Sequence, residues 1–201
     1  MRKITLTLTL AFFAAGALAA GQEAASISSL VEKVGGANEA EKYEALHALG
    51  DQGGKASSAI SSVALVLSDT KASLNSRLEA AATLGKIGGK EGVAALSAAL
   101  ADGNPHLRAW AAKALGMLGP DAAASVGALK TAAADPEAFV RREAVKALGP
   151  VGSPEALSLA QRLASSDQDE TVRKKAAIAA AQIQEQKAVA DKQAQASEGS
   201  K

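Results

Sequence analysis

The chain has no cysteine and very few aromatic residues. Without cysteine it can form no disulfide, and it offers no thiolate to a metal ion or to a lipid anchor attached through a thiol. Aromatic side chains make up 2% of the 201 residues, whereas apolar residues together reach 48%. Alanine, leucine and valine must therefore fill the core, and such short side chains suit helices that approach each other closely.

Neither sign of charge is in excess. The 22 basic and 21 acidic residues leave a formal charge of +1, which becomes −1 if Arg2 and Lys3 are removed with the segment described next. Proteins that bind nucleic acid by neutralising phosphates carry an excess of basic residues. The sequence therefore predicts no nucleic-acid partner.

The first twenty residues have the pattern of an export signal. Arg2 and Lys3 precede an apolar stretch over residues 4–18, and Ala17-Leu18-Ala19 has the small-x-small form of a cleavage site. The stretch is shorter than the roughly 20 residues of a membrane-spanning helix. We expect residues 1–20 to be a cleaved signal peptide, and the remaining chain to be exported to the periplasm or the extracellular space without stable membrane insertion. An uncleaved signal anchor is the alternative.

One motif recurs along the chain. Its copies are SRLEAAATLGKIG from Ser76, LRAWAAKALGMLG from Leu107, VRREAVKALGPVG from Val140 and a decayed VRKKAAIAAAQI from Val172. The glycine that follows Ala-Leu or Thr-Leu in the first three copies is Gly85, Gly116 or Gly149, and we call these the motif glycines. They are 31 and 33 residues apart, and a fainter copy, EKYEALHALGDQG, places Gly50 another 35 residues upstream. A period in this range indicates an array of stacked repeats.

Each copy of the motif has the apolar spacing of a helix. Val140, Ala144, Ala147 and Leu148 fall at i, i+4, i+7 and i+8, which predicts one buried face. We expect each motif glycine, such as Gly149, to end its helix with a positive φ, because glycine tolerates that conformation. Pro150 is expected to stop the helix for want of an N–H group.

Plainer segments between the motif copies carry their own apolar stripes and predict further helices, so the chain reads as helix pairs. We refer to the helix that contains the motif as the second helix of its pair. The expected pairs cover residues 26–50, 55–86, 90–117, 121–150 and 153–183. From Gln184 the chain is polar and low in bulk, and residues 184–201 are expected to be a tail that begins as a fraying helix and ends disordered.

The motif and the residues before it form a recognisable pattern, which consists of an aspartate, a few residues, Val-Arg, two residues, Ala, two residues and Ala-Leu-Gly. It resembles the HEAT repeat, in the short HEAT-like form named after the phycobilin lyases, over about residues 26–183. The resemblance implies an all-α fold, an α-solenoid (α-α superhelix) of about five antiparallel helix pairs. Such arrays serve unrelated activities, so the fold names no function.

The motif repeatedly places an arginine six residues after an aspartate. The residues concerned are Asp102 and Arg108, Asp135 and Arg141, and Asp167 and Arg173, while Arg77 follows Asp69 by eight residues. The resemblance implies that the carboxylate accepts backbone N–H bonds at the start of the second helix and that the guanidinium bonds along the stack. A row of catalytic acids and bases is the alternative. Catalysis needs one site, whereas this feature recurs, so we expect a structural ladder.

The second helices of HEAT-like pairs line the concave side, so their outward residues form the candidate partner surface. One aligned column reads Glu44, Glu79, Trp110, Glu143 and Lys175, and it contains the only tryptophan of the chain. An aromatic side chain surrounded by charge is typical of an interface anchor. The residues expected to bind a partner are Trp110, Lys113, Glu79, Glu143, Arg142 and Lys146. Alternatively, Trp110 covers alanine-sized gaps between repeats or is an incidental surface residue.

Residues for metal or covalent chemistry are scarce. His47 is expected on a second helix and His106 in a turn two repeats away, so they would not share a metal. The related deoxyhypusine hydroxylases hold iron with His-Glu pairs, whereas Ala48 and Leu107 follow the histidines here. We expect no catalytic residue, no cofactor and no metal.

The expected function is a non-catalytic interaction scaffold of the bacterial cell envelope that holds a protein or peptide on its concave face. The alternatives are an enzyme accessory or lyase-like modification subunit, and an architectural part of an envelope assembly.

Overall fold

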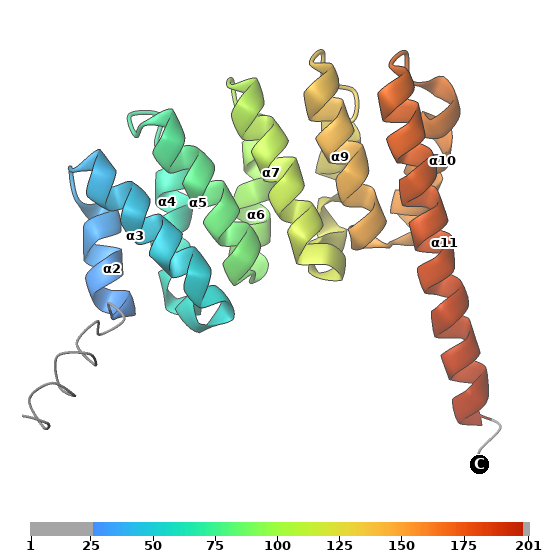
Figure 1. Cartoon of the computed structure of the whole chain (residues 1–201), viewed down its shortest axis with the longest axis horizontal. Coiled ribbons are helices and arrows are strands. Elements are labelled where there is room, and N and C mark those ends of the chain that lie inside the picture. Colours follow the sequence, from blue (N-terminus) through green and yellow to red (C-terminus); the bar gives the residue numbers. More distant parts are fainter. Residues whose placement is uncertain (1–25, 199–201) are drawn as a thin grey trace, which may run out of the picture.

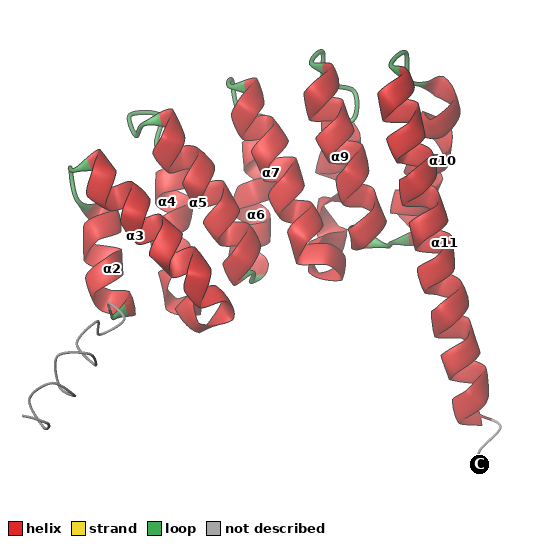
Figure 2. Ribbon diagram, viewed as in Figure 1, coloured by secondary structure: helices red, strands yellow, loops and turns green. Residues whose placement is uncertain are grey.

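The computed structural model describes residues 26–198, and the expected signal peptide at 1–20 lies outside them. Figure 2 shows helices joined by short loops, and no strand occurs between residues 26 and 198. The expected all-α solenoid is confirmed, because helix pairs stand side by side in a single row (Figure 1). Over the same residues, no helix combines the length and apolar character needed to cross a membrane.

The helices form two layers. The first helices of the pairs are α2 (Ile27–Gly35), the 3-10 turn η1 (Gly53–Ala59) with α4 (Ile60–Ser68), α6 (Lys90–Ala99), η2 (Gly119–Ser125) with α8 (Val126–Ala132), and α10 (Pro154–Ser166). The second helices are α3 (Glu39–Gln52), α5 (Leu74–Ile87), α7 (Pro105–Leu118), α9 (Ala138–Val151) and α11 (Glu170–Glu198). Figure 1 shows the second helices aligned in the front layer, which we call the second-helix face.

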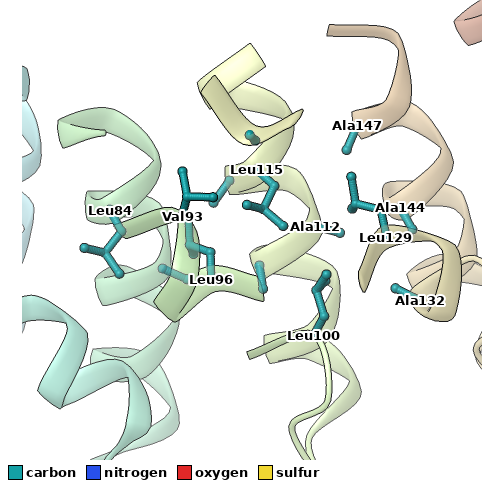
Figure 3. Close-up of a cluster of buried hydrophobic side chains, with 14 of the residues drawn as sticks. Leu84, Val93, Leu96, Leu100, Ala112, Leu115, Leu129, Ala132, Ala144 and Ala147 are labelled. Atoms are coloured by element: carbon teal, nitrogen blue, oxygen red, sulfur yellow. The ribbon is translucent and has the colours of Figure 1, made fainter. Parts of the chain in front are cut away.

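The core between the layers is built from leucine and alanine. Leu84, Leu96, Leu115 and Leu129 come from successive helices and are fully buried, and Figure 3 shows them in one continuous cluster. Alanines such as Ala112 lie between neighbouring second helices. The scarcity of aromatic residues is therefore matched by a thin core that short side chains can fill.

The prediction that motif glycines end the second helices with positive φ is wrong. Each of these helices runs on to a later glycine, at Gly53, Gly88, Gly119 or Gly152, and these residues carry the positive φ values. Pro150 does not stop α9, which continues to Val151. A proline in the last turn gives up one backbone hydrogen bond, and its fixed φ is compatible with the helix.

The motif glycines instead allow neighbouring second helices to approach. A Cβ atom added to Gly85 would lie 2.9 Å from Cβ of Ala114, and one added to Gly116 would lie 3.1 Å from Cα of Ala147. Contacts this short leave no room for a methyl group. Gly85 therefore allows the close approach of α5 and α7, and Gly116 that of α7 and α9.

The polar segment from Gln184 onward continues the last helix. Helix α11 continues to Glu198 as one helix of 29 residues, and every side chain from Gln184 to Ser197 is exposed. This segment is rich in alanine, glutamine, glutamate and lysine, which are strong helix formers. It also extends a helix whose first turns are already packed, so no new nucleus is needed. Residues 199–201 lie outside the described part.

Candidate partner-binding surface

The Asp–Arg ladder links consecutive repeats. In Arg108, Nη1 donates to the backbone oxygen of Asp102 in its own repeat at 2.9 Å. Its Nε and Nη2 donate to the two carboxylate oxygens of Asp135, in the next repeat, at 2.6 and 2.9 Å. Arg141 repeats this arrangement with Asp167, at 3.1 and 3.3 Å. These bidentate bonds fix the rotation of one repeat on the next.

The aspartates of the ladder also order the turn between the helices of a pair. Asp102, Asp135 and Asp167 each accept the backbone N–H two residues later, at 2.8, 2.9 and 2.8 Å. Burial acts to raise the pKa of Asp102. The hydrogen bonds from the Asn104 N–H and from Arg77, with the nearby positive charge, outweigh burial and leave that pKa below its ordinary value.

The first repeat has Gly36 and Lys42 where the other repeats have the ladder aspartate and arginine, and a glutamate makes the contact to the next repeat instead. Glu39 accepts a hydrogen bond from Lys42 at 2.5 Å and, from the next repeat, bonds from the Ser76 hydroxyl at 2.7 Å and the Ser73 N–H at 3.0 Å. The bond from Lys42 and those from the serines lower the pKa of Glu39 from 4.5 to about 2. Glu39 thus joins the first repeat to the second.

This lowered pKa predicts acid sensitivity at the N-terminal end. A carboxylate whose pKa is lower in the folded chain stabilises it fully above the unfolded pKa and loses that effect as pH falls toward the folded pKa. We expect the Glu39→Gln variant to lose less of its unfolding free energy than the parent between about pH 4.5 and 2. Denaturant unfolding at a series of pH values measures this.

Glu185→Gln, on the exposed part of α11, is the matched control and should lose as much stability in acid as the parent. Parallel acid profiles for Glu39→Gln and the parent would contradict the prediction.

Two hollows lie on the second-helix face, one on each side of Trp110. The first, of about 350 Å³, is lined by Tyr43, Asn75, Leu78, Glu79 and Trp110, and we call it the acidic hollow. The second, of about 300 Å³, is lined by His106, Ala109, Trp110, Lys113, Phe139, Arg142, Glu143 and Lys146, and we call it the basic hollow. Trp110 is the wall that they share.

Aromatic side chains converge on these hollows. The described residues contain three, Tyr43, Trp110 and Phe139, and each lines at least one hollow. The ring of His106 stacks on Phe139 with centroids 5.3 Å apart. The ammonium of Lys113 lies 4.3 Å from the centre of the Trp110 ring, in a cation–π contact. In a chain with so few aromatic residues, this concentration makes the region around the two hollows the candidate partner-binding surface.

The charges of the two hollows differ in sign. Glu79 is the only charged residue that lines the acidic hollow. It lies 3.0 Å from Nδ1 of His47, and its negative charge raises the pKa of Tyr43. The basic hollow has three cationic residues and a single carboxylate, Glu143, which bonds Lys146 at 2.8 Å. Along the row, the surface therefore passes from negative to positive across Trp110.

The six residues expected to bind a partner all line these hollows. Glu79 lines the acidic hollow, Lys113, Arg142, Glu143 and Lys146 line the basic one, and Trp110 lines both. Trp110 is 36% exposed, so its ring both covers a groove between repeats and remains accessible.

Sequence reasoning missed part of the lining. Asn75, His106 and Phe139 occupy one aligned position, two residues before the ladder arginine. His106 was expected in a turn but lies in the first turn of α7. Once the helix starts are known, helix spacing places His106 four residues before Trp110 and therefore on the same side.

A larger hollow of about 610 Å³ lies in the layer of first helices, between α4 and α6. Its apolar lining consists of alanines and leucines, including Leu65, and no aromatic side chain contributes. The hydroxyl of Ser61 donates to Glu91 at 3.0 Å, so these two polar groups at its edge already satisfy each other. Arg77 and Asp102 also line it, and they bond each other in the ladder. The charged groups of this hollow are therefore already paired, and we do not assign a ligand to it.

Side chains for metal binding do not gather in the described chain. Between residues 26 and 198, no group of three or more histidine, aspartate or glutamate side chains could hold a metal ion. His47 contacts Glu79 and Asp51, and His106 packs on Phe139 in a different repeat.

Comparison with solved structures shows the same fold in several proteins. The complex of CpcE and CpcF of phycocyanin lyase from Nostoc matches with a TM-score of 0.62 and 24% identity, over 79% of this chain and 65% of that one. Human deoxyhypusine hydroxylase matches with a TM-score of 0.58 and 22% identity, over 82% of this chain and 75% of that one. A designed armadillo repeat protein in complex with the peptide (KR)4 matches with a TM-score of 0.58 and 19% identity, over 87% of this chain and 84% of that one.

At these identities the likeness concerns the fold. No curated protein matches the chain in sequence. The family model described as HEAT repeats matches residues 61–139 and 127–191, which is more than half of the chain. The chain therefore belongs to the HEAT-repeat family.

Proposed function

We propose that this chain is a non-catalytic interaction scaffold of the bacterial cell envelope that binds an extended segment of a protein partner along the second-helix face. The observation that carries the proposal is the concentration of aromatic side chains around two hollows that share Trp110. Exposed aromatic residues flanked by charge are the usual anchors of interfaces. The envelope location depends on the export-signal pattern of residues 1–20.

The charges favour a particular class of segment. A basic residue fits Glu79, a large apolar residue fits against Trp110 and Phe139, and an acidic residue fits beside Lys113 and Arg142. Glu79 and Arg142 lie two repeats apart. With helices spaced about 9 Å apart and about 3.3 Å per extended residue, this separation corresponds to about six residues. The designed armadillo repeat protein of similar fold is in complex with the peptide (KR)4, which supports a peptide segment as the class of ligand.

The test is a selection of peptides from a random display library on the purified chain. We expect the selected peptides to carry a basic and an acidic residue about six positions apart with a large apolar residue between them. Binding is measured by the fluorescence of Trp110, the only tryptophan of the chain, and by calorimetry. Trp110→Ala should weaken binding by about 30-fold or more while the thermal melt is unchanged.

Met117→Ala is the matched control, because Met117 is an exposed apolar residue of the same helix that lines neither hollow. It should bind as the parent does. Peptides that bind Trp110→Ala as tightly as the parent would refute the proposed site.

A further inference from the structure

The C-terminal end of the stack carries an arginine arranged like the other ladder arginines. Nη1 of Arg173 donates to the backbone oxygens of Asp167 at 2.7 Å and Gln168 at 3.2 Å. Nη1 of Arg141 makes the same pair of bonds, to Asp135 at 2.9 Å and Pro136 at 3.1 Å. The two guanidinium groups are therefore held in the same way.

The Nε and Nη2 edge of Arg173 differs from that of the other ladder arginines in having no acceptor in the described part of the chain. In Arg108 and Arg141, Nε and Nη2 bind the aspartate of the following repeat. Within residues 26–198 no acceptor bonds Nε or Nη2 of Arg173. A planar pair of N–H donors is thus aimed along the stack, toward the place where a sixth repeat would offer a carboxylate.

The outer side of α11 has the small residues that receive a next repeat elsewhere. Ala81, Ala112 and Val145 are fully buried by the following repeat, whereas Ala177 at the aligned position is exposed. Ala181 is exposed in the place of the motif glycine against which the next helix packs. In Figure 1 no helix lies beyond α11 in the row. This end is an open end of the array rather than a polar cap.

Two other charged groups near Arg173 already have partners. Lys174 lies next to Arg173 and is exposed, and its ammonium is paired with Glu170 at 2.6 Å across one turn of α11. The Asp169 carboxylate, in the turn before Arg173, accepts the N–H groups of Thr171 and Val172. Among the described residues, the Nε and Nη2 edge of Arg173 is therefore a charged group at this end that lacks a carboxylate partner. Its complement is a carboxylate presented by a docking partner.

A second copy of this chain does not supply that complement. At its leading end, Gly36 stands six residues before Lys42, in the place of the ladder aspartate. Glu41 occupies the position at which Leu107 and Val140 pack on the preceding repeat. Docking a second copy would bury the carboxylate of Glu41 and leave Arg173 unpaired, and both are costly. Head-to-tail contacts would also continue into filaments.

We propose that the open end formed by Arg173, Lys174, Ala177 and Ala181 docks the leading helix pair of a different HEAT-like chain whose inter-helix turn presents an aspartate. That aspartate accepts hydrogen bonds from Nε and Nη2 of Arg173, as Asp167 does from Arg141, and a helix of the partner covers Ala177. The contact is independent of the peptide-binding function proposed above.

The test uses a probe with the leading end that the proposal requires. The probe is this chain with Gly36→Asp and Glu41→Val, which restore the ladder pattern, and Arg173→Ala, which prevents the probe from binding itself. Gly36 has φ −71° and ψ 166°, an extended conformation that aspartate adopts. Its Cβ would lie 3.2 Å from the backbone oxygen of Lys33, so the turn must shift by a few tenths of an ångström to accept it. Sedimentation of the natural chain, the probe and their mixture is measured at equal concentrations.

We expect a one-to-one complex in the mixture and monomers of each chain alone. Arg173→Ala in the natural chain should weaken the complex by about 30-fold or more, because it removes both N–H donors from a desolvated carboxylate. Arg162→Ala removes a positive charge from α10 on the side that faces η2 and α8, and it should have no effect.

Ala177→Lys provides a second variant in case Arg173→Ala disturbs the turn that Arg173 orders. Ala177 is exposed in the free chain, so the substitution leaves the fold intact but blocks the docking helix. The absence of a complex would overturn the proposal, as would a complex that survives both Arg173→Ala and Ala177→Lys. Self-assembly of the natural chain would overturn the choice of a different chain as the partner.

Discussion

Arg141→Ala is expected to lower the unfolding free energy by about 3–5 kcal/mol. Arg141 is 5% exposed and donates to both carboxylate oxygens of Asp167, whose side chain is also 5% exposed. Removing the guanidinium leaves that carboxylate without its counter-charge, and the turn carbonyls of Asp135 and Pro136 lose their donor. The thermal melt should fall by roughly 10 °C.

The loss should be local as well as global. In a stack of repeats each unit contacts only its neighbours, so removal of one ladder bond weakens one interface. Hydrogen exchange should therefore increase most in α10 and α11, beyond the broken contact between Arg141 and Asp167, and least in α2 and α3. Exchange combined with thermal melts monitored by circular dichroism measures both effects.

Arg142→Ala is the matched control. Arg142 is the neighbouring residue and carries the same charge, but its closest carboxylate, on Glu143, is 3.8 Å away and its side chain is 41% exposed. We expect its melt to stay close to that of the parent, because exposed ion pairs contribute little. A melt of Arg141→Ala that matches the parent, or equal losses in both variants, would show that the ladder does not hold the stack together.

The motif was sufficient to predict the fold because it carries the contacts between repeats. The spacing of Asp135 and Arg141 follows from a bond within one repeat, between Nη1 and the Asp135 carbonyl, and from a bond to the next repeat. Sequence reasoning placed the helices correctly but misjudged their ends. The motif glycines were interpreted through their conformational freedom, whereas at Gly85 and Gly116 the structure uses the missing side chain. That role depends on the neighbouring helix, which a single repeat does not reveal.

The candidate surface was partly predictable for a similar reason. Trp110 stood out because aligned positions carry glutamate or lysine, so repetition within the chain provided the comparison. Phe139 and His106 were missed because they lie in the first turn of their helices, where the sequence does not fix the helix start. Their stacking joins two repeats, and it becomes visible only when the repeats are placed side by side.

Gly85→Leu is expected to destabilise the chain by about 3 kcal/mol, the second largest effect that we expect. Gly85 lies inside α5, where a Cβ atom would be 2.9 Å from Cβ and 3.1 Å from Cα of Ala114 in α7. Because Cα belongs to the backbone, the clash cannot be relieved by rotating a side chain. A leucine would have to force α5 and α7 apart and disturb the bond between Arg77 and Asp102 that joins the same two repeats.

The same substitution at Gly127, Gly127→Leu, should stabilise the chain rather than destabilise it. Gly127 lies in α8, is exposed, and has nothing within 4 Å of the position of an added Cβ. Replacing a helical glycine in open space stabilises a helix by about 0.5–1 kcal/mol. Denaturant unfolding of both variants measures the two changes. If both glycines tolerate leucine equally, helix propensity rather than close approach explains the motif glycine, and the spacing of the stack must be set by the leucine core alone.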